Sequence, residues 1–342
     1  MKVDRRRCVT VRRPDSGASL IEMLVAFGLT VMVAVGALSL FVLHQRLARA
    51  QLEAASLQQS QQAVHLELRR ALRAAGRGGL AHQLPGQPAR RELALEVEAD
   101  VTAGHAVGSA AAAEGTDVLV VRGVINGPLY WVDEYRFDPA ARRGWVTVRA
   151  RPAHASVQSL EMLREAGDAG DDALLLVSGD APGVHAVVPI VDVVPSDPDR
   201  DGALRVEFHA DPSRGPVAAA FLSISSGGTW PAGYMGAVDR VGVLEEWRFY
   251  VRPPDPDSLR GSQLAMARLY PGTGIAWDRR SANLAQVIAD DIADLEVAVE
   301  ELGEGRGWSI AVATTARAGE PAAAALRVPR TAATVVRLRN LR

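Results

Sequence analysis

The chain has 342 residues, 48% of them hydrophobic and 5% aromatic, which suffices for one large or two modest domains with cores of Val, Leu and Ala. Its formal net charge of −2 combines +4 on residues 1–17 with a mildly acidic remainder, which gives no electrostatic footprint for nucleic acid. The single cysteine, Cys8, lies in the basic segment, so the rest of the chain has neither a disulfide framework nor a cysteine metal site.

An apolar run, residues 18–43, follows the basic segment and contains one charged residue, Glu22. About 20 apolar residues are enough for a helix to span a bilayer. The basic residues before the run predict a cytoplasmic N-terminus and place the large C-terminal part in the periplasm or outside the cell. Because an unpaired charge in a membrane helix is costly, Glu22 indicates a function beyond anchoring.

Three simpler interpretations of this run stay open. One is a secretory signal peptide, since Ala48-Arg49-Ala50 offers a small-x-small cleavage site, although the run exceeds the usual length of about 7–15 residues. The second is an ordinary membrane anchor whose glutamate has no special role. The third is a buried helix of a soluble protein.

The junction at residues 17–22, with the sequence GASLIE, resembles the type IV pilin and pseudopilin family. In that family a prepilin peptidase cleaves after a leader glycine, and a glutamate is fifth in the mature chain. The resemblance implies that Gly17 ends the leader, that Ala18 becomes the first mature residue, and that Glu22 acts in subunit assembly. The Leu-Ile pair before the glutamate matches the family. Ala18 stands where most members have Phe, so the match is incomplete at the residue that the peptidase would N-methylate.

A continuous helix is predicted for residues 20–75, which lack proline and end before Gly76, Gly78 and Gly79. At 1.5 Å per residue this helix is about 84 Å long. Its first part, residues 18–43, is apolar on all sides and is expected to cross the membrane. Its second part, residues 44–79, is amphipathic and is expected to lie on a globular domain. The predicted contact stripe consists of Leu57, Gln61, Val64, Leu68, Ala71 and Ala75.

Beyond Gly79, short β-type runs alternate with Gly, Pro and Asp clusters, which predicts a β-rich globular domain over residues 80–342. The expected strands are residues 116–125, 129–137, 145–149, 173–177, 185–194, 204–209, 219–225, 241–251, 264–269, 294–299, 309–313 and 334–338. Short helices are expected at residues 157–165 and 282–288, and loops at 99–115 and 253–260. In the strand 294–299, period-two alternation directs Leu295, Val297 and Val299 to one face.

The predicted fold class is therefore α+β, with a long N-terminal helix packed on a β-rich C-terminal domain, as in pilins. Four fragments of this domain resemble strands of PilW-type minor pilins in the same order along the chain. They are residues 115–121, 247–251, 287–299 and 335–340. J-type pseudopilins of type II secretion share the architecture but are typically much shorter than this chain.

Residues 197–202 read Asp-Pro-Asp-Arg-Asp-Gly and match the first half of a calcium loop. The carboxylates of Asp197, Asp199 and Asp201 could converge on one cation, and Gly202 permits the sharp turn. An EF-hand needs Glu at the twelfth position, where this chain has Phe208. Two interpretations stay open: a calcium loop of another type, and a metal-free turn between two strands.

No sequence motif indicates catalysis. The seven histidines are scattered, and H-E-x-x-H, G-x-S-x-G, Walker and dinucleotide glycine patterns are all lacking. We therefore predict that the protein is not an enzyme and has no cofactor apart from the calcium considered above.

The sequence as a whole predicts a minor pilin that acts in type IV pilus assembly or initiation. It would pass once through the inner membrane and carry a periplasmic C-terminal domain, and it could enter a pilus fibre or its tip. The resemblance implies as partners a prepilin peptidase, other minor and major pilins, the inner-membrane assembly platform and membrane lipid. A type II secretion pseudopilin of the J type and a membrane-anchored periplasmic binding or adhesion module are the alternatives.

Overall fold

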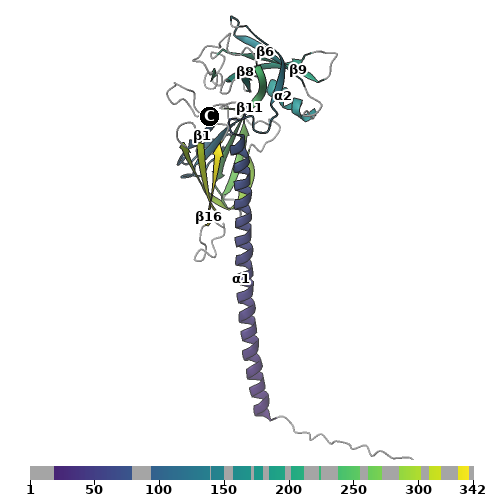
Figure 1. Cartoon of the computed structure of the whole chain (residues 1–342). Coiled ribbons are helices and arrows are strands. Elements are labelled where there is room, and N and C mark those ends of the chain that lie inside the picture. The colour runs from purple at the N-terminus through teal and green to yellow at the C-terminus, as the bar shows by residue number, and fades with distance from the viewer. Residues whose placement is uncertain are drawn as a thin grey trace, which may run out of the picture. The chain divides into compact units, whose positions relative to one another are not determined.

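The computed structural model describes thirteen stretches of the chain (Figure 1). They are residues 19–78, 94–138, 140–149, 157–170, 173–179, 185–196, 202–211, 223–224, 238–254, 261–271, 285–301, 308–316 and 330–338. Two compact units divide the chain, residues 1–55 and residues 56–342.

Helix α1 covers Leu20–Ala74, so the predicted helix is confirmed to within one residue. Gly76 and Gly78 follow it with φ angles of 67° and 97°, the left-handed conformation that commonly ends a helix. Residues 20–53, which make up nearly all of this helix in the first unit, are exposed on every side. This stretch is long and apolar enough to cross a membrane, which is compatible with a membrane anchor.

The part of α1 in the second unit buries the predicted stripe. Val64, Leu68 and Ala71 are completely buried, and Gln61 is 7% exposed. Leu57 is half-buried against the same core. The amphipathic pattern therefore identified the packed face of the helix correctly, because residues three and four apart lie on one side of an α-helix.

A five-stranded antiparallel sheet supplies one surface against which α1 packs. Its order is β1 (Leu95–Glu98), β4 (Val118–Gly123), β11 (Val238–Arg252), β12 (Gln263–Leu269) and β13 (Ala285–Asp290). Leu119, Trp247 and Leu264 share a core with α1. Their neighbours Val118 and Tyr250 face a second core on the opposite side, which also contains residues of the small hairpin β2 (Ala106–Val107) and β3 (Ala110–Ala111). Both faces are covered, which explains the nearly continuous apolar strands.

The first half of β11 belongs to a closed antiparallel barrel. Pairing runs from β11 to β5 (Tyr130–Asp138), β6 (Arg143–Arg149), β9 (Ala203–His209), β8 (His185–Pro195), β7 (Leu174–Gly179) and back to β11. Helix α2 (Val157–Ala169) buries Leu160, Leu163 and Ala166 in the barrel core. The two-residue strand β10 (Ser223–Ile224) pairs with β8. One long strand, β11, is thus shared by the barrel and the five-stranded sheet.

A three-stranded antiparallel sheet also packs against α1. It consists of β14 (Ile292–Glu301), β15 (Trp308–Ala316) and β16 (Arg330–Leu338). Leu295, Ile310 and Val336 join the core that contains the helix. The predicted alternation is confirmed, because Val297 and Val299 are half-buried whereas their neighbours in β14 are exposed.

Polar side chains of α1 also reach this sheet. Gln61 Nε2 donates to the carbonyl of Thr314 at 3.3 Å, and Arg69 donates to the Thr334 hydroxyl at 2.9 Å. His65 Nε2 lies 3.2 Å from the Thr314 hydroxyl. Burial is the main reason that the pKa of His65 is lowered, and the charge of Arg69 acts in the same direction. Directional hydrogen bonds as well as apolar contacts therefore hold α1 against this sheet.

Backbone hydrogen bonds join the C-terminal end of α1 to β4. Gly76 N donates to the Arg122 carbonyl at 3.0 Å, and Val124 N donates to the Arg77 carbonyl at 3.1 Å. A Cβ on Gly123 would come within 2.9 Å of the Ala74 carbonyl oxygen, so only glycine fits this close approach.

Several predictions for the β-rich part were wrong or incomplete. Residues 282–288 were expected to be helical, but the described part belongs to β13, where pairing with β12 overrides the helix propensity of Ala and Gln. The expected loop 99–115 contains the β2–β3 hairpin, in which Gly108 has a φ of 62°. Strand β1 was not predicted, and α2 extends to Ala169. Of the expected strand 219–225 only β10 lies in the described residues, and most of the expected loop 253–260 lies outside them.

Candidate functional site

Glu22 lies in the first turn of α1 and caps its own helix. Its Oε2 accepts a hydrogen bond from the backbone N–H of Ser19 at 3.0 Å. The carbonyl of Ser19 in turn accepts the N–H of Met23 at 3.1 Å, which makes Ser19 the N-cap residue. The pattern Ser-x-x-Glu at the start of a helix is the sequence of a capping box. This signal was present in the sequence and could have predicted the contact.

The capping contact offsets only a small part of the free-energy cost of placing a carboxylate in a membrane. A negative charge at a helix N-terminus is favourable by about 0.3–1 kcal/mol. Burying an unpaired acidic residue at the centre of a membrane helix costs about 2.5–3.5 kcal/mol by insertion measurements. Within the described residues, Glu22 makes no ion pair. A cationic partner would therefore still lower its free energy.

Two other polar side chains of the apolar run, those of Thr30 and Ser39, are satisfied within the helix. Thr30 Oγ1 donates to the Ala26 carbonyl at 2.7 Å, and Ser39 Oγ donates to the Val35 carbonyl at 2.8 Å. Such bonds to the preceding turn let hydroxyl groups face an apolar solvent. Glu22 therefore differs from them, because among the described residues only one of its two carboxylate oxygens accepts a hydrogen bond.

The predicted processing and calcium residues lie outside the described part of the chain. Gly17 and Ala18 precede its first residue, Ser19, and Asp197, Asp199 and Asp201 fall in the gap between Ser196 and Gly202. The flanking strands β8 and β9 are antiparallel partners, and Ser196 N donates to the Ala203 carbonyl at 3.0 Å. The Asp-rich segment therefore links two paired strands, which fits both a calcium loop and a simple turn.

Calcium binding at this segment is tested through stability. If calcium binds there, Asp199→Ala is expected to lower the melting temperature only when calcium is present. Binding adds about 2.7 kcal/mol to the free energy of unfolding at a hundredfold excess of ligand over its Kd. Melting curves of wild type and variant with calcium and with chelator measure this. Identical wild-type curves in the two conditions would contradict calcium binding at this segment.

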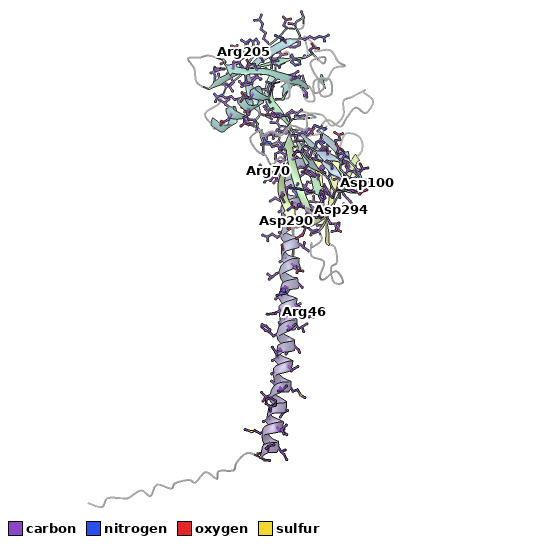
Figure 2. All side chains as sticks on the ribbon, turned by 180° about the vertical axis from the view of Figure 1, so that it is seen from behind. Arg46, Arg70, Asp100, Arg205, Asp290 and Asp294 are labelled. Carbon is purple, nitrogen blue, oxygen red and sulfur yellow. The ribbon has the colours of Figure 1, made fainter. Side chains whose placement is uncertain are left out.

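No metal site is formed by the part of the chain that the structure describes, in the sense of three or more His, Cys, Asp or Glu side chains arranged around one point. The acidic residues near the start of β4 have a structural role. Asp117 accepts the backbone N–H groups of Asp100 and Val297 at 3.0 and 2.7 Å, which joins β14 to the loop before β4. Burial raises the pKa of the nearby Asp294, and the charges of Asp117 and Asp100 add to this effect (Figure 2).

Sequence reasoning missed a pair of buried glutamates in the middle of β11. Glu246 and Arg122 are 0% and 2% exposed, and Arg122 Nε donates to Glu246 Oε2 at 2.6 Å. Arg122 also binds Glu96 at 2.7 Å, and Arg248 Nε donates to the second oxygen of Glu246 at 2.7 Å. Burial by itself would raise the pKa of Glu246, but Arg122 and Arg248 outweigh it and hold that pKa below its ordinary value.

Glu245, the neighbour of Glu246, faces the other side of the sheet and is also completely buried. Its carboxylate accepts the backbone N–H groups of Asn126 and Gly127 at 2.8 and 2.9 Å, the Trp247 indole at 3.1 Å and Arg268 Nε at 2.9 Å. Glu245 and Glu246 thus lie where β11 leaves the barrel partners and joins β4. The two acids fix this junction, and in the sequence they form an adjacent Glu-Glu pair in a strand that also carries other charged residues.

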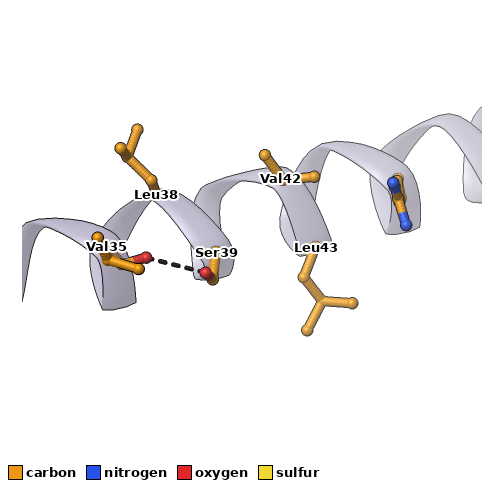
Figure 3. Close-up of a pocket in the computed structure, with 6 residues that line it drawn as sticks. Val35, Leu38, Ser39, Val42 and Leu43 are labelled. Atoms are coloured by element: carbon orange, nitrogen blue, oxygen red, sulfur yellow. Dashed lines mark hydrogen bonds between the residues drawn. The ribbon is translucent and has the colours of Figure 1, made fainter. Parts of the chain in front are cut away.

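A shallow groove runs along α1 between the side chains of Val35, Leu38, Ser39, Val42, Leu43 and Arg46 (Figure 3). The first five of these residues belong to the apolar run, and Arg46 is the first charged residue after it. Since Ser39 donates to the backbone of its own helix, the floor of the groove is effectively apolar. The groove is therefore suited to a lipid-like or helical apolar surface.

No protein-family model matches this chain, and no curated protein and no solved structure matches it either. Its functional interpretation rests on the residues and geometry described above.

Proposed function

We propose that the chain is a pilin-like subunit, a minor pilin of a type IV pilus, held in the inner membrane by residues 18–43 with a periplasmic β-rich domain. The observation that carries this proposal is Glu22. It is the only charged residue of the apolar run, it lies in the first turn of α1, and it is fifth in the chain that begins after Gly17. The resemblance at residues 17–22 supplies the assignment to the pilin family.

Pairing between subunits gives this carboxylate a physical role. Cleavage after Gly17 creates a positive amine at Ala18, and the amine of one subunit can neutralise Glu22 of its neighbour. In an apolar medium two opposite charges in contact attract each other strongly, whereas a single unpaired charge is heavily penalised. The pair therefore favours the docked subunit over the isolated one, and it acts as a gate on assembly.

The two-part character of α1 supports the same proposal. Residues 20–53 expose an apolar and then a polar surface to their surroundings, whereas the later turns are packed into the β-rich unit. A subunit that leaves the bilayer must transfer its apolar surface to another apolar surface, because exposure to water costs about 25 cal/mol per Å². Neighbouring helices of the same kind provide such a surface within a fibre.

A membrane-anchored periplasmic module is the second candidate, and the capping contact favours it. If Glu22 serves only to cap its helix through Ser19, no neighbouring subunit is needed. The J-type pseudopilin of type II secretion is a variant of the first proposal, since it differs in the machine served and not in the role of Glu22. The mature N-terminus separates pilin from anchored module.

N-terminal processing is the first test. The mature chain is expected to begin at Ala18, and Gly17→Val is expected to leave the precursor uncut, because a branched side chain obstructs a site that requires a small residue. N-terminal sequencing and intact mass of membrane-extracted protein measure both outcomes. Gly28→Val is the matched control, since a Cβ at Gly28 meets no atom within 4 Å. A normal mature N-terminus in Gly17→Val would contradict the leader assignment.

A further inference from the structure

The groove on α1 combines an apolar floor with a cationic end. Val35, Ser39, Val42 and Arg46 follow one another at spacings of four, three and four residues, so they share one face of the helix. The larger Leu38 and Leu43 stand on its two sides and form the walls. Because Val and Ser are smaller than Leu, the floor is lower than the walls, and a slender apolar chain can lie along it.

The charges near Arg46 are positive. Arg46 and Arg49 are exposed, and the first acidic residue after them is Glu53, which is two helical turns beyond Arg46. Neither arginine forms an ion pair within the described part of the chain, and Arg46 projects from the helix (Figure 2). A guanidinium group binds phosphate oxygens with two parallel hydrogen bonds. The end of the groove is therefore complementary to a phosphate group.

The dimensions of the groove fit one leaflet of a bilayer. Val35 and Arg46 are eleven residues apart, which is about 16 Å along the helix. Half of a bilayer hydrocarbon core is about 15 Å. An acyl chain that lies on Val35 and Val42 would thus place its headgroup phosphate at the level of Arg46.

From this geometry we infer that the groove is a binding site for an anionic phospholipid, with the phosphate on Arg46 and one acyl chain along Val42, Ser39 and Val35. The inference rests on the membrane insertion that belongs to the proposed function. A bound lipid would set the depth of α1 in the membrane. It would also have to be released before the helix could leave the bilayer.

The test uses the full chain in neutral detergent, mixed with phosphatidylglycerol and phosphatidylcholine in equal amounts. Lipid retained after gel filtration is counted by mass spectrometry. Wild type is expected to retain phosphatidylglycerol over phosphatidylcholine by about fivefold, the effect of one basic residue near an anionic surface. Arg46→Gln is expected to bring this ratio close to one. Arg164→Gln removes the same charge from an exposed position on α2 and is expected to keep the wild-type ratio.

Two further arms separate the possible failures. Flotation with phosphatidylcholine vesicles measures insertion alone, and a chain that does not float would overturn the membrane proposal and this inference together. A chain that floats but shows no preference, or keeps its preference in Arg46→Gln, would overturn the lipid site only. Inorganic phosphate is the third probe: complete displacement of the lipid by phosphate at equal concentration would mean that the site binds the anion without the acyl chain.

Discussion

Glu22→Gln is expected to impair co-assembly with other pilin subunits as strongly as Glu22→Ala. The two variants differ in one contact, because the Gln amide oxygen can still accept the hydrogen bond from Ser19 N–H whereas Ala cannot. They share the loss of the negative charge. If the charge pairs with the amine of a neighbouring subunit, both variants lose that pair, and the preserved cap of Glu22→Gln gives no advantage.

The expected effect is at least tenfold. An unpaired acidic group at the centre of a membrane helix is penalised by about 2.5–3.5 kcal/mol, and about half of that penalty in the first turn still changes the equilibrium tenfold, since each 1.4 kcal/mol is a factor of ten. The neutral variants escape this penalty in the isolated subunit but gain nothing on docking, so the docked fraction falls. Crosslinking of the subunit to co-expressed minor pilins, together with counts of surface fibres, measures the change. Cleavage, membrane insertion and folding of the periplasmic domain are expected to stay intact.

Glu53→Gln is the matched control, since Glu53 is an exposed glutamate on the same helix outside the apolar run. It is expected to assemble like wild type. Normal assembly of Glu22→Gln together with failure of Glu22→Ala would show that the carboxylate is needed only as a cap. Normal assembly of both variants would contradict any assembly role for Glu22, and loss of folding would count against the pairing role as well.

Sequence reasoning was most successful where local patterns decide the structure. The apolar run, the lack of proline and the glycines at its end were sufficient to define α1, because helix formation depends on neighbours within a few turns. The stripe that contains Val64 and Leu68 also identified the packed face. Alternation in β14 correctly predicted which side of that strand is buried.

The arrangement of the strands could not be predicted in the same way. The barrel closes because β11 pairs with both β5 and β7, and these pairings join residues more than a hundred and about sixty positions apart. Nothing in the local pattern indicates that β11 changes partners at Glu245. Strand β13 was mistaken for a helix for a related reason, since its pairing with β12 and not its own composition determines its conformation.

The candidate site followed from the sequence only in part. Glu22 could be selected because a single carboxylate in an apolar run is conspicuous. Its contact with Ser19 could also have been predicted from the Ser-x-x-Glu pattern. The pairing of Glu246 with Arg122 could not, because Arg122 belongs to a strand that is 124 positions away in the sequence.

Arg122→Met is expected to destabilise the β-rich unit by about 3–5 kcal/mol, the usual effect of removing one partner from a buried ion pair. The substitution removes from Glu246, which is 0% exposed, the charge of Arg122 while that of Arg248 stays, and it also removes the ion pair between Arg122 and Glu96. Chemical unfolding of the full chain in detergent, followed by tryptophan fluorescence, measures the free energy of unfolding. Arg149→Met is the matched control: Arg149 is 59% exposed and lies 3.2 Å from Asp133, so its loss should cost no more than about 1 kcal/mol.

The pH dependence of this difference provides a second, independent readout. In the wild type the pKa of Glu246 is held below its ordinary value, so its contribution to stability is present above the ordinary glutamate pKa of about 4.3 and is lost as pH falls through the lowered pKa. In Arg122→Met the main opposing charge is gone, so Glu246 takes up its proton at a higher pH, and protonation relieves the buried charge. The difference in unfolding free energy between the two proteins should therefore be largest near pH 7 and should shrink toward pH 4. A constant difference across this range would mean that lost packing, and not the buried charge, is responsible for the destabilisation.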